Sequence, residues 1–305
     1  MIAMALLVRI GTRSSRLALW QANHVASLLE PYASPTIVEI QTAGDQVRDV
    51  PLPQIGGEGV FTKEIQRALT EFKVDVAVHS LKDLPTVHVA GIVLAAVPPR
   101  GPSGDVFVSH RHDRFDSLPK GAVVATSSLR RRAQILNRRP DLQVVDIRGN
   151  VETRLRKLDS ENLDGLILAQ AGLERLELDE EITEVLDPSW MLPAVGQGAL
   201  GLECRFDDEE TLEVIRLLDD PETHEAVAAE RAFLRTLQGG CQVPIGASAK
   251  VKDERLNLRG VVLDGHGKRR IEGRINGAAD TAEELGRQLA HDLIARGAAE
   301  LLGVK

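Results

Sequence analysis

The chain has 305 residues, of which 43% are hydrophobic and 27% are charged, and its formal net charge is −8. This size and composition predict a packed protein of two or three domains and exclude a largely disordered chain. The negative balance and an aromatic content of only 3% argue against a protein that coats nucleic acid, which needs excess positive charge or stacking rings. The two cysteines form no CxxC or Cys–His pattern, so neither a disulfide scaffold nor a zinc ribbon is expected.

Short β-branched runs alternate with helix-period segments over the first two thirds of the sequence. This alternation is typical of α/β folds with a largely parallel sheet. Within residues 1–100, strands are predicted at 8–10, 36–41 and 74–78, and helices at 17–29 and near 62–72. Pro98, Pro99, Gly101 and Pro102 then mark a crossover between domains.

A second α/β unit follows this crossover. Strands are predicted at 122–125, 143–147 and 165–168, and helices at 129–137 and 151–158. Pro193, Gly196 and Gly198 mark a second crossover, after which a strand at 199–204 is expected to rejoin the first sheet. From about residue 220 the pattern changes to a helix at 224–237, strands at 256–263 and 270–275, and a terminal helix at 281–302.

These patterns predict three domains. The first is discontinuous, residues 1–99 with 197–217; the second spans residues 103–193; and the third, residues 220–305, is α+β. No apolar run reaches the roughly 18 residues of a membrane span, and the first residues carry no cationic leader. We therefore expect a cytoplasmic protein that has no membrane partner and binds no metal.

Charge is unevenly distributed along the chain. Residues 1–100 are neutral overall, residues 101–160 hold twelve basic and seven acidic side chains, and residues 161–305 hold sixteen basic and twenty-nine acidic ones. A positive segment in an acidic chain favours a site for a small polyanion. A solvated basic helix face is the more common origin of such a segment, so its position along the chain matters.

Three predicted strand-to-helix junctions, residues 11–15, 126–132 and 148–150, place arginine at or just before a first helical turn. Each junction also offers a Ser, Thr or Asn to cap the helix. Cations are unfavourable at a helix N-terminus, whereas anions bind there. A bound carboxylate or phosphate therefore explains these arginines best. No Walker or dinucleotide-binding glycine motif occurs, which disfavours a nucleotide. The arginines concerned are Arg13, Arg130, Arg131, Arg148 and, one turn further on, Arg154.

Two other residues are candidates for chemistry. Asp83 follows the strand at 74–78 and precedes Pro85, where an aspartate is commonly turn-forming; the functional alternative is a carboxylate that stabilises a developing cation or moves a proton. Cys241 lies in the glycine-rich loop GGCQVPIG, which predicts an exposed thiol suited to covalent chemistry. Cys204 follows a strand-like run and fits an inert, buried thiol.

Taken together, these motifs closely resemble the hydroxymethylbilane synthase (porphobilinogen deaminase) family. The resemblance covers nearly the whole chain, and the order of its elements is highly specific. They are RIGTRSSRLALWQANHV, IGGEGVFTKEIQ, VDVAVHSLKDLPT, ATSSLRRRAQIL, DIRGNVETRL, LPAVGQGALGLECR and GGCQVPIGA.

The resemblance implies a fold, a reaction and a set of roles. The fold is two type II periplasmic-binding-protein-like α/β domains around a cleft, with a small C-terminal α+β domain. The enzyme is a monomeric transferase of heme and porphyrin biosynthesis. It condenses four porphobilinogen molecules head to tail, with loss of ammonia, and releases a linear tetrapyrrole.

The family's primer is a dipyrromethane cofactor held through a thioether to the cysteine of the GGCQ loop, here Cys241. Asp83 corresponds to the catalytic acid, and Gln197 belongs to the inter-domain hinge. The residues implied to bind the carboxylates of cofactor and growing chain are Arg13, Ser15, Lys82, Ser128, Arg130, Arg131, Arg148 and Arg154.

Two other functions would account for part of this pattern. A non-catalytic anion-binding protein of the periplasmic-binding fold accounts for the arginine junctions and the crossovers, but it gives no reason for the open Cys241 loop or for a third domain. An RNA-binding protein that uses residues 101–160 is disfavoured by the few aromatics and by the total charge. Porphobilinogen, a small molecule, is therefore the expected partner, and nucleic acid is not.

Overall fold

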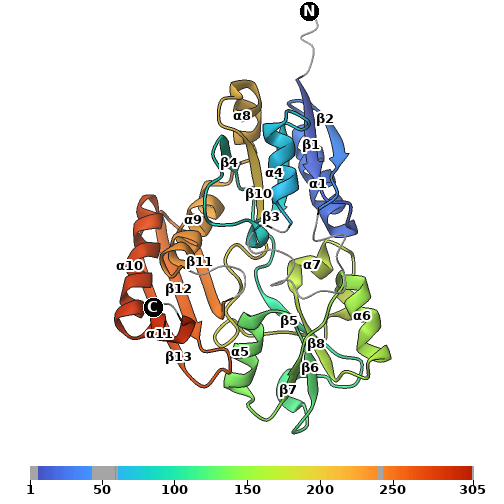
Figure 1. Cartoon of the computed structure of the whole chain (residues 1–305), viewed down its shortest axis with the longest axis vertical. Coiled ribbons are helices and arrows are strands. Elements are labelled where there is room, and N and C mark those ends of the chain that lie inside the picture. The colour runs from blue at the N-terminus through green and yellow to red at the C-terminus, as the bar shows by residue number, and fades with distance from the viewer. Residues whose placement is uncertain (1–5, 43–58, 60, 239–242, 304–305) are drawn as a thin grey trace, which may run out of the picture. The chain divides into compact units, whose positions relative to one another are not determined.

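A computed structural model describes residues 6–42, 59, 61–238 and 243–303 (Figure 1). The contacts divide the chain into two compact units, Met1–Arg100 with Ala199–His224 and Gly101–Gly198 with Glu225–Lys305. The chain therefore passes between the units at 100–101, 198–199 and 224–225. The division into three domains, which is finer than this division into two units, stays a prediction.

The first unit is built on a mixed five-stranded sheet with the strand order β2-β1-β3-β10-β4. β1 pairs in parallel with β2 and β3, whereas β10 runs antiparallel to β3 and β4. The prediction that the strand near 199–204 rejoins the first sheet is thus confirmed. The elements are β1 (Leu7–Thr12), α1 (Arg16–Leu29), β2 (Ser34–Glu39), α4 (Lys63–Thr70), β3 (Val76–Ser80), the 3-10 turn η1 (Leu81–Asp83), β4 (Ile92–Ala96), β10 (Leu200–Arg205) and α8 (Glu209–Arg216).

Helices cover both faces of this sheet. On one face, Val25 of α1 shares an apolar core with Val76 and Val78 of β3. On the other, Leu69 of α4 shares a core with Ala77. Because successive strand residues point to opposite faces, each residue of β3 belongs either to the α1 layer or to the α4 layer.

An ion-pair cluster lies at the start of β3. Asp75 accepts hydrogen bonds from Arg9, Nε to Oδ2 at 2.9 Å and Nη2 to Oδ1 at 2.7 Å, and from Arg205 Nη2 at 3.0 Å. Burial raises the pKa of the Asp75 carboxyl, but the hydrogen bonds from the two guanidinium groups outweigh it and lower that pKa from 3.8 to about 2. The cluster therefore stabilises the folded state while Asp75 is ionised.

We expect Asp75→Asn to flatten the acid dependence of unfolding. Because the folded pKa lies below its ordinary value of 3.8, Asp75 stabilises the fold above that pH and loses this contribution as the pH falls through about 2. In urea unfolding, the free-energy advantage of the wild type over the variant should shrink by about 2 kcal/mol between pH 6 and pH 2. Asp207→Asn, at an exposed position, is the control. A constant advantage across this range would contradict the prediction.

The second unit contains another five-stranded sheet, with the order β7-β6-β8-β5-β9. β6 pairs in parallel with β7 and β8, and β5 runs antiparallel to β8 and β9. Helices α5 and α6 follow β6 and β7 directly. The elements are β5 (Asp105–Val108), η2 (Phe115–Ser117), β6 (Val123–Ala125), α5 (Leu129–Arg138), β7 (Gln143–Val145), α6 (Val151–Ser160), β8 (Gly165–Ala169), α7 (Gln170–Glu174), η3 (Asp179–Glu181) and β9 (Glu184–Val185).

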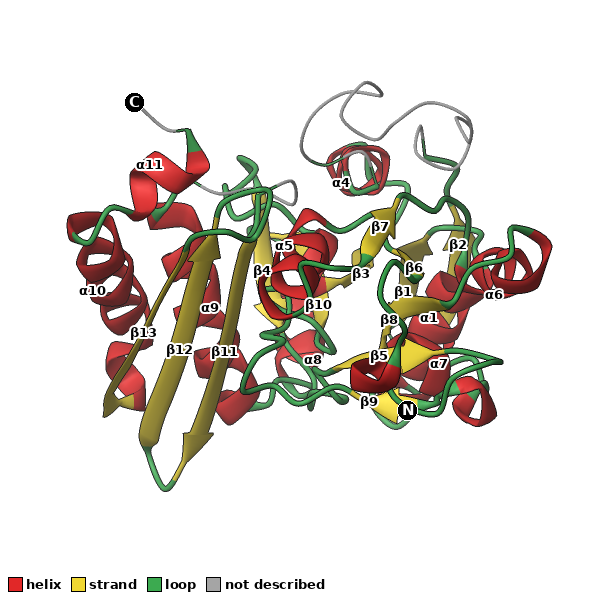
Figure 2. Ribbon diagram, turned by 90° about the horizontal axis from the view of Figure 1, so that it is seen from below, coloured by secondary structure: helices red, strands yellow, loops and turns green. Residues whose placement is uncertain are grey.

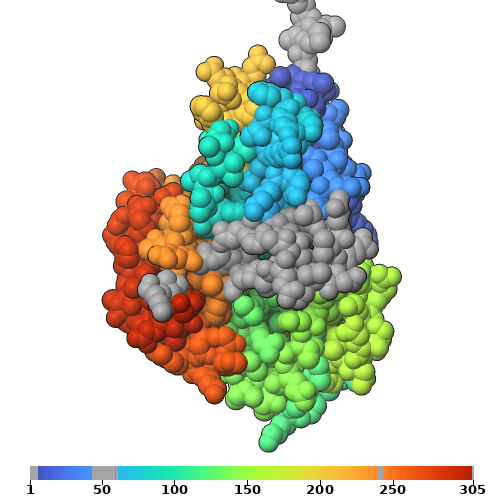
Figure 3. Space-filling view, viewed as in Figure 1, coloured from blue at the N-terminus to red at the C-terminus, as the bar shows by residue number. Residues whose placement is uncertain are grey.

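The rest of the second unit is an antiparallel sheet, β11-β12-β13, packed against helices (Figure 2). Phe233 of α9, Leu258 of β12 and Leu289 of α10 share the core of this part. Figure 3 shows the outer surface formed by α10 and α11 (red). The elements are α9 (Pro221–Thr236), β11 (Ile245–Lys252), β12 (Arg255–Leu263), β13 (Arg270–Ala278), η4 (Ala279–Thr281), α10 (Ala282–Ala295) and α11 (Ala298–Leu302). The predicted class, two α/β sheets with a small C-terminal α+β part, is confirmed. The prediction of a single terminal helix is wrong, because Gly297, at φ +94°, interrupts it.

The two sheets of the second unit are joined through α5 and β12. Asn137 Nδ2, in α5, donates a hydrogen bond to the carbonyl of Gly267 at 2.8 Å. An apolar cluster completes the contact: Ala133, Leu192, Val261 and Leu263. The C-terminal sheet is therefore packed against the helix that carries the Arg130–Arg131 pair.

Gly198 lies where two chain segments of the second unit approach closely. Its φ is +87°, and a Cβ atom there would lie 2.5 Å from the carbonyl oxygen of Gly101. Gly101 N donates to Gly198 O at 3.2 Å, and Arg175 Nη2 donates to the same oxygen at 2.6 Å. Both the backbone angle and the space thus require glycine.

Gly198→Ala should lower the free energy of unfolding by about 2–3 kcal/mol, because left-handed backbone strain and a backbone clash add. Gly91→Ala separates the two causes: Gly91 has φ +82° but nothing within 4 Å of its Cβ position, so only the strain of about 1 kcal/mol remains. Urea unfolding measures both. Equal losses for the two variants would show that the close approach costs nothing.

Candidate active site

In the first unit, the predicted site residues follow two neighbouring parallel strands. Arg13 and Ser15 come after β1, and Lys82 and Asp83 lie in η1, directly after β3. The carboxyl ends of parallel strands meet at one edge of a sheet, which is where α/β proteins place ligands. The structure therefore brings these four residues to one edge.

The segment after β1 has two local anchors. Ser15 is the N-cap of α1, as predicted, and its Oγ accepts a hydrogen bond from Ala18 N at 3.3 Å. The guanidinium carbon of Arg13 lies 4.1 Å from the centre of the Phe61 ring, within the range of cation–π attraction. Sequence analysis missed Phe61; its only signal was an aromatic residue in a chain that has few. The contact joins the β1 loop to the residues that precede α4.

The turn that carries Lys82 and Asp83 is fixed through its backbone. Leu81 N donates to Ala199 O at 3.0 Å, and Leu84 N donates to Leu81 O at 3.1 Å. Leu81 is buried, whereas Lys82 and Asp83 are partly exposed. A buried leucine thus holds the turn while two oppositely charged side chains reach the surface of the unit.

In the second unit, the other two arginine junctions follow the neighbouring parallel strands β6 and β7. Ser128 caps α5 and Asn150 caps α6; each side chain accepts a hydrogen bond from the N–H three residues on, at 3.4 Å and 2.9 Å. Ser127 Oγ donates to the carbonyl of Ile147, which links the two turns. The helix N-termini predicted to bind anions therefore lie at one edge of this sheet.

Arg148 and Arg154 are partly exposed at this edge. Arg154 Nε donates to the carbonyl of Gly149 at 2.8 Å, which turns the side chain back toward the start of its own helix. Their position at the N-terminus of α6 is the one predicted. Their role in binding carboxylates stays a prediction.

Arg130 and Arg131 both turn inward onto Asp105, the first residue of β5. Arg130 Nη1 donates to Asp105 Oδ2 at 2.6 Å, and Arg131 donates to Oδ1 from Nη2 at 2.7 Å and from Nε at 3.0 Å. The exposed fractions are 0% for Asp105, 4% for Arg130 and 6% for Arg131. Sequence analysis did not identify this carboxylate, because nothing in the local sequence pairs it with arginines 25 residues away.

The cluster holds two guanidinium charges and one carboxylate charge, so one positive charge has no opposite charge among its three members. Burial raises the pKa of Asp105, but the two guanidinium groups outweigh it and hold that pKa well below its usual range. Burial also lowers the pKa of Arg130, yet arginine stays charged at neutral pH. Both arginines belong to the first turn of α5, where the helix dipole is also positive. Both contributions favour an anion.

Gln197 ties the second crossover to the same cluster. Its Nε2 donates to Asp105 Oδ1 at 2.9 Å and to the carbonyls of Ser103 and Gly104 at 2.8 and 3.1 Å. The predicted hinge residue therefore shares its carboxylate partner with Arg130 and Arg131.

The two cysteines differ in what the structure says of them. Cys241, the predicted attachment site, lies outside the described residues. Cys204 has an exposed fraction of 0%, and burial raises its pKa to about 12. The prediction that Cys204 is buried is confirmed, and a thiol in that state is a poor nucleophile.

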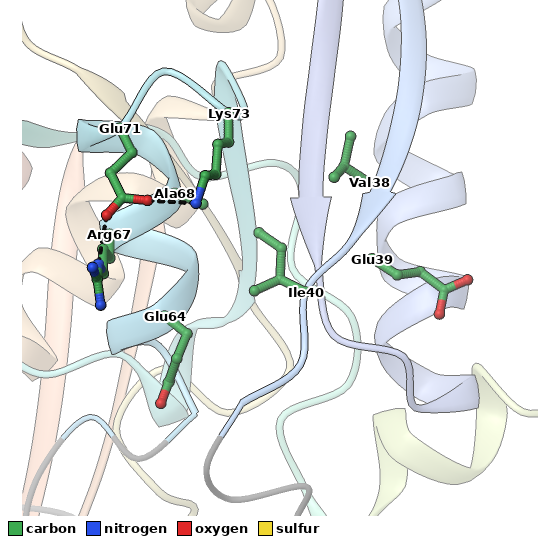
Figure 4. Close-up of a pocket in the computed structure, with 8 residues that line it drawn as sticks. All are labelled: Val38, Glu39, Ile40, Glu64, Arg67, Ala68, Glu71 and Lys73. Atoms are coloured by element: carbon green, nitrogen blue, oxygen red, sulfur yellow. Dashed lines mark hydrogen bonds and ion pairs between the residues drawn. The ribbon is translucent and has the colours of Figure 1, made fainter.

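One surface hollow of about 450 Å³ lies beside α4 and the end of β2 (Figure 4). Both of its cations pair with the same carboxylate: Glu71 accepts from Arg67 Nε at 2.6 Å and pairs with Lys73 Nζ at 2.6 Å. None of the predicted site residues lines it. Within the described part of the chain, no group of three or more His, Cys, Asp or Glu residues is arranged to hold a metal ion, and no helix is long and apolar enough to cross a membrane.

Comparison with known proteins gives consistent matches along the chain. The family model "Porphobilinogen deaminase, dipyromethane cofactor binding domain" matches residues 8–213, and "Porphobilinogen deaminase, C-terminal domain" matches residues 224–295. The methionine-binding protein MetQ, a solved structure, matches with a TM-score of 0.44 and 13% identity over 81% of this chain and 99% of its own. That likeness is too slight to support an inference.

Curated relatives are far more similar. Porphobilinogen deaminase of Syntrophotalea carbinolica is 52% identical over 97% of this chain and 95% of its own length. The proteins of the same name from Pelobacter propionicus and Desulforudis audaxviator are 50% and 51% identical, each over 97% of this chain and 96% of its own length. The chain therefore belongs to the porphobilinogen deaminase family.

Proposed function

We propose that this chain is a hydroxymethylbilane synthase, a transferase that joins four porphobilinogen molecules head to tail and releases the linear tetrapyrrole hydroxymethylbilane. Each step forms a carbon–carbon bond between the aminomethyl carbon of one pyrrole and the free ring carbon of the next, and it expels ammonia and a ring proton. The observation that carries the proposal is family membership at about 50% identity over 97% of the chain.

The basic groups of the structure suit a ligand that carries many carboxylates. Every added pyrrole brings two carboxylates and no cation that persists, so a growing chain needs arginines and helix N-termini to hold it. We propose that these contacts come from Arg13, Ser15, Lys82, Ser128, Arg148 and Arg154. Arg130 and Arg131 contribute the surplus charge of their cluster with Asp105.

A dipyrromethane group fits this donor set, because its four carboxylates match arginine and serine donors and its attachment requires a single thiol. We propose that Cys241 holds it through a thioether. When bound, the group supplies the free pyrrole carbon to which the first substrate is joined. The burial of Cys204 argues against this role for it.

Asp83 is proposed to act at the reacting substrate. Loss of ammonia from porphobilinogen leaves an electron-deficient methylene pyrrolenine, and a carboxylate fixed beside it stabilises the developing positive charge. The same carboxylate can take up the proton that the new bond displaces. The adjacent Lys82 is suited to a substrate carboxylate. The resemblance further suggests a cytoplasmic monomer with no nucleic-acid or membrane partner.

Mass spectrometry tests the proposal directly. The purified chain should carry added mass equal to two linked pyrroles on the tryptic peptide that contains Cys241, and chain freed of that mass should regain it on incubation with porphobilinogen. Ammonia and a tetrapyrrole should then appear with turnover. A non-catalytic anion-binding protein would bind porphobilinogen without covalent mass or ammonia, and that result would overturn the proposal.

A further inference from the structure

The last two residues of β3 differ in character from the three before them. Val76, Ala77 and Val78 are apolar and pack into the α1 and α4 layers. His79 and Ser80 are polar, yet they occupy the same two layers, directly before the turn that carries Asp83. Polar side chains in such positions cost free energy unless they are hydrogen-bonded. Their partners therefore show what they do.

On the α4 face, His79 meets a buried carboxylate. His79 Nε2 lies 3.0 Å from Glu203 Oε2, and Gln66 Nε2 of α4 donates to both Glu203 oxygens at 3.1 and 3.0 Å. The three residues are only 4–7% exposed. Glu203 belongs to β10, so this contact joins two adjacent strands and the helix that covers them.

On the α1 face, Ser80 is held by a reciprocal pair. Gln21 Nε2 of α1 donates to Ser80 Oγ at 2.7 Å, and Ser80 Oγ lies 3.1 Å from Gln21 Oε1. Gln21 is 3% exposed. The end of β3 is thus held directly by a side chain of α1 on one face, and on the other face through Glu203, which a side chain of α4 fixes.

The same two helices begin at the predicted site. Ser15 caps α1, and Phe61, which lies against Arg13, precedes the first turn of α4. Helix α1 therefore runs from a site segment to a hydrogen bond with β3. Helix α4 runs from a site segment to Glu203 of β10, which lies beside His79 of β3. Apolar packing alone would tolerate small shifts of these elements, whereas the hydrogen bonds of Gln21 to Ser80 and of Gln66 to Glu203 fix distance and direction. Among the residues that the structure describes, His79 Nε2 makes no hydrogen bond, and it is held beside Glu203 by close approach.

We propose that two polar contacts, Gln21–Ser80 and Gln66–Glu203–His79, form a positioning frame that holds the η1 turn and so aims Asp83. None of these five residues is assigned contact with the reacting atoms; they act through the placement of Asp83. This inference rests on the proposed function, because it takes Asp83 to be the catalytic carboxylate. An ångström of misplacement of such a group costs rate out of proportion to its cost in binding.

Ser80→Ala tests the frame with the smallest change. Loss of the hydroxyl should lower kcat about tenfold with KM changed less than twofold, since the carboxylate-binding arginines are untouched. Ser80→Thr keeps the hydroxyl and should recover kcat to within threefold of wild type. Ser34→Ala, an exposed serine at the start of β2 in the same sheet, is the matched control and should match wild type.

Gln66→Met provides a second test from the other face, because it removes the amide while keeping the side-chain length. It should give the same selective loss of kcat, with primer occupancy at Cys241 unchanged by mass spectrometry. A lowered Tm with normal kcat in both Ser80→Ala and Gln66→Met would overturn the frame, as would a Ser80→Thr variant as slow as Ser80→Ala. Wild-type protein that makes no tetrapyrrole would contradict the proposed function itself; active wild type with unimpaired variants contradicts the frame alone.

Discussion

Replacing Cys241 with serine should give a folded protein that carries no primer and makes no hydroxymethylbilane. A thiol is nucleophilic at neutral pH because a useful fraction is ionised, whereas a serine hydroxyl without an adjacent base is not. Without a tether, the first pyrrole units are not held, and we expect turnover to fall by at least about a thousandfold. Intact-protein mass and ammonia release measure the two effects separately.

Cys204→Ala is the matched control for this experiment. Cys204 is fully buried, and burial raises its pKa to about 12, so its removal should leave the added mass in place and cost stability by about 1 kcal/mol. Full added mass and normal turnover in Cys241→Ser would refute the tether. If Cys204→Ala lost the added mass while Cys241→Ser retained it, the primer would be attached to Cys204 and not to Cys241.

The local features of the site were predictable from sequence. Ser15, Ser128 and Asn150 each cap a helix as expected, because capping depends on a side chain and an N–H group three residues on. The return of β10 to the first sheet was also predictable, since a strand-like run follows a Pro- and Gly-rich crossover. Such features depend only on residues that are close together in the sequence.

Contacts between distant residues were not predictable in this way. Arginines at a helix N-terminus, such as Arg130 and Arg131, indicate a nearby negative charge. Asp105 supplies one such charge, and it comes close only once β5 has paired in the sheet. The frame around His79 is similar, because Glu203 is distant in sequence and meets it through the pairing of β10 with β3. Spacing along the chain carries no sign of either pairing.

Some elements escaped prediction for a different reason. β5 spans four residues, begins with a charged side chain and directly follows a Pro- and Gly-rich segment, so it shows neither alternation nor length. In β11 the buried positions include the small residues Ala247 and Ala249, and lysines follow further along the strand. This gives only a weak apolar alternation. The terminal helix was predicted as one element because a single glycine lowers helix propensity by only about 1 kcal/mol; at Gly297 the backbone instead takes positive φ.

Asp83→Asn should keep the primer and the fold but slow turnover by about a hundredfold to a thousandfold. The change is isosteric, and Asp83 is partly exposed at the end of a turn that Leu81 anchors, so stability should change by less than about 0.5 kcal/mol. What is lost is the negative charge beside the developing cation, and removal of one such electrostatic contact typically costs a factor of this size.

The measurement that decides the role of Asp83 is single-turnover ammonia release, compared with the mass added at Cys241. We expect slow release while the added mass persists, because Arg13 and Arg148, which we propose bind carboxylates, are untouched. Glu71→Gln, which removes a carboxylate paired with Arg67 and Lys73 on the surface of the same unit, should leave the rate as in the wild type. Near-native release by Asp83→Asn would remove Asp83 from the chemistry, and the frame around β3 would then have no carboxylate to position.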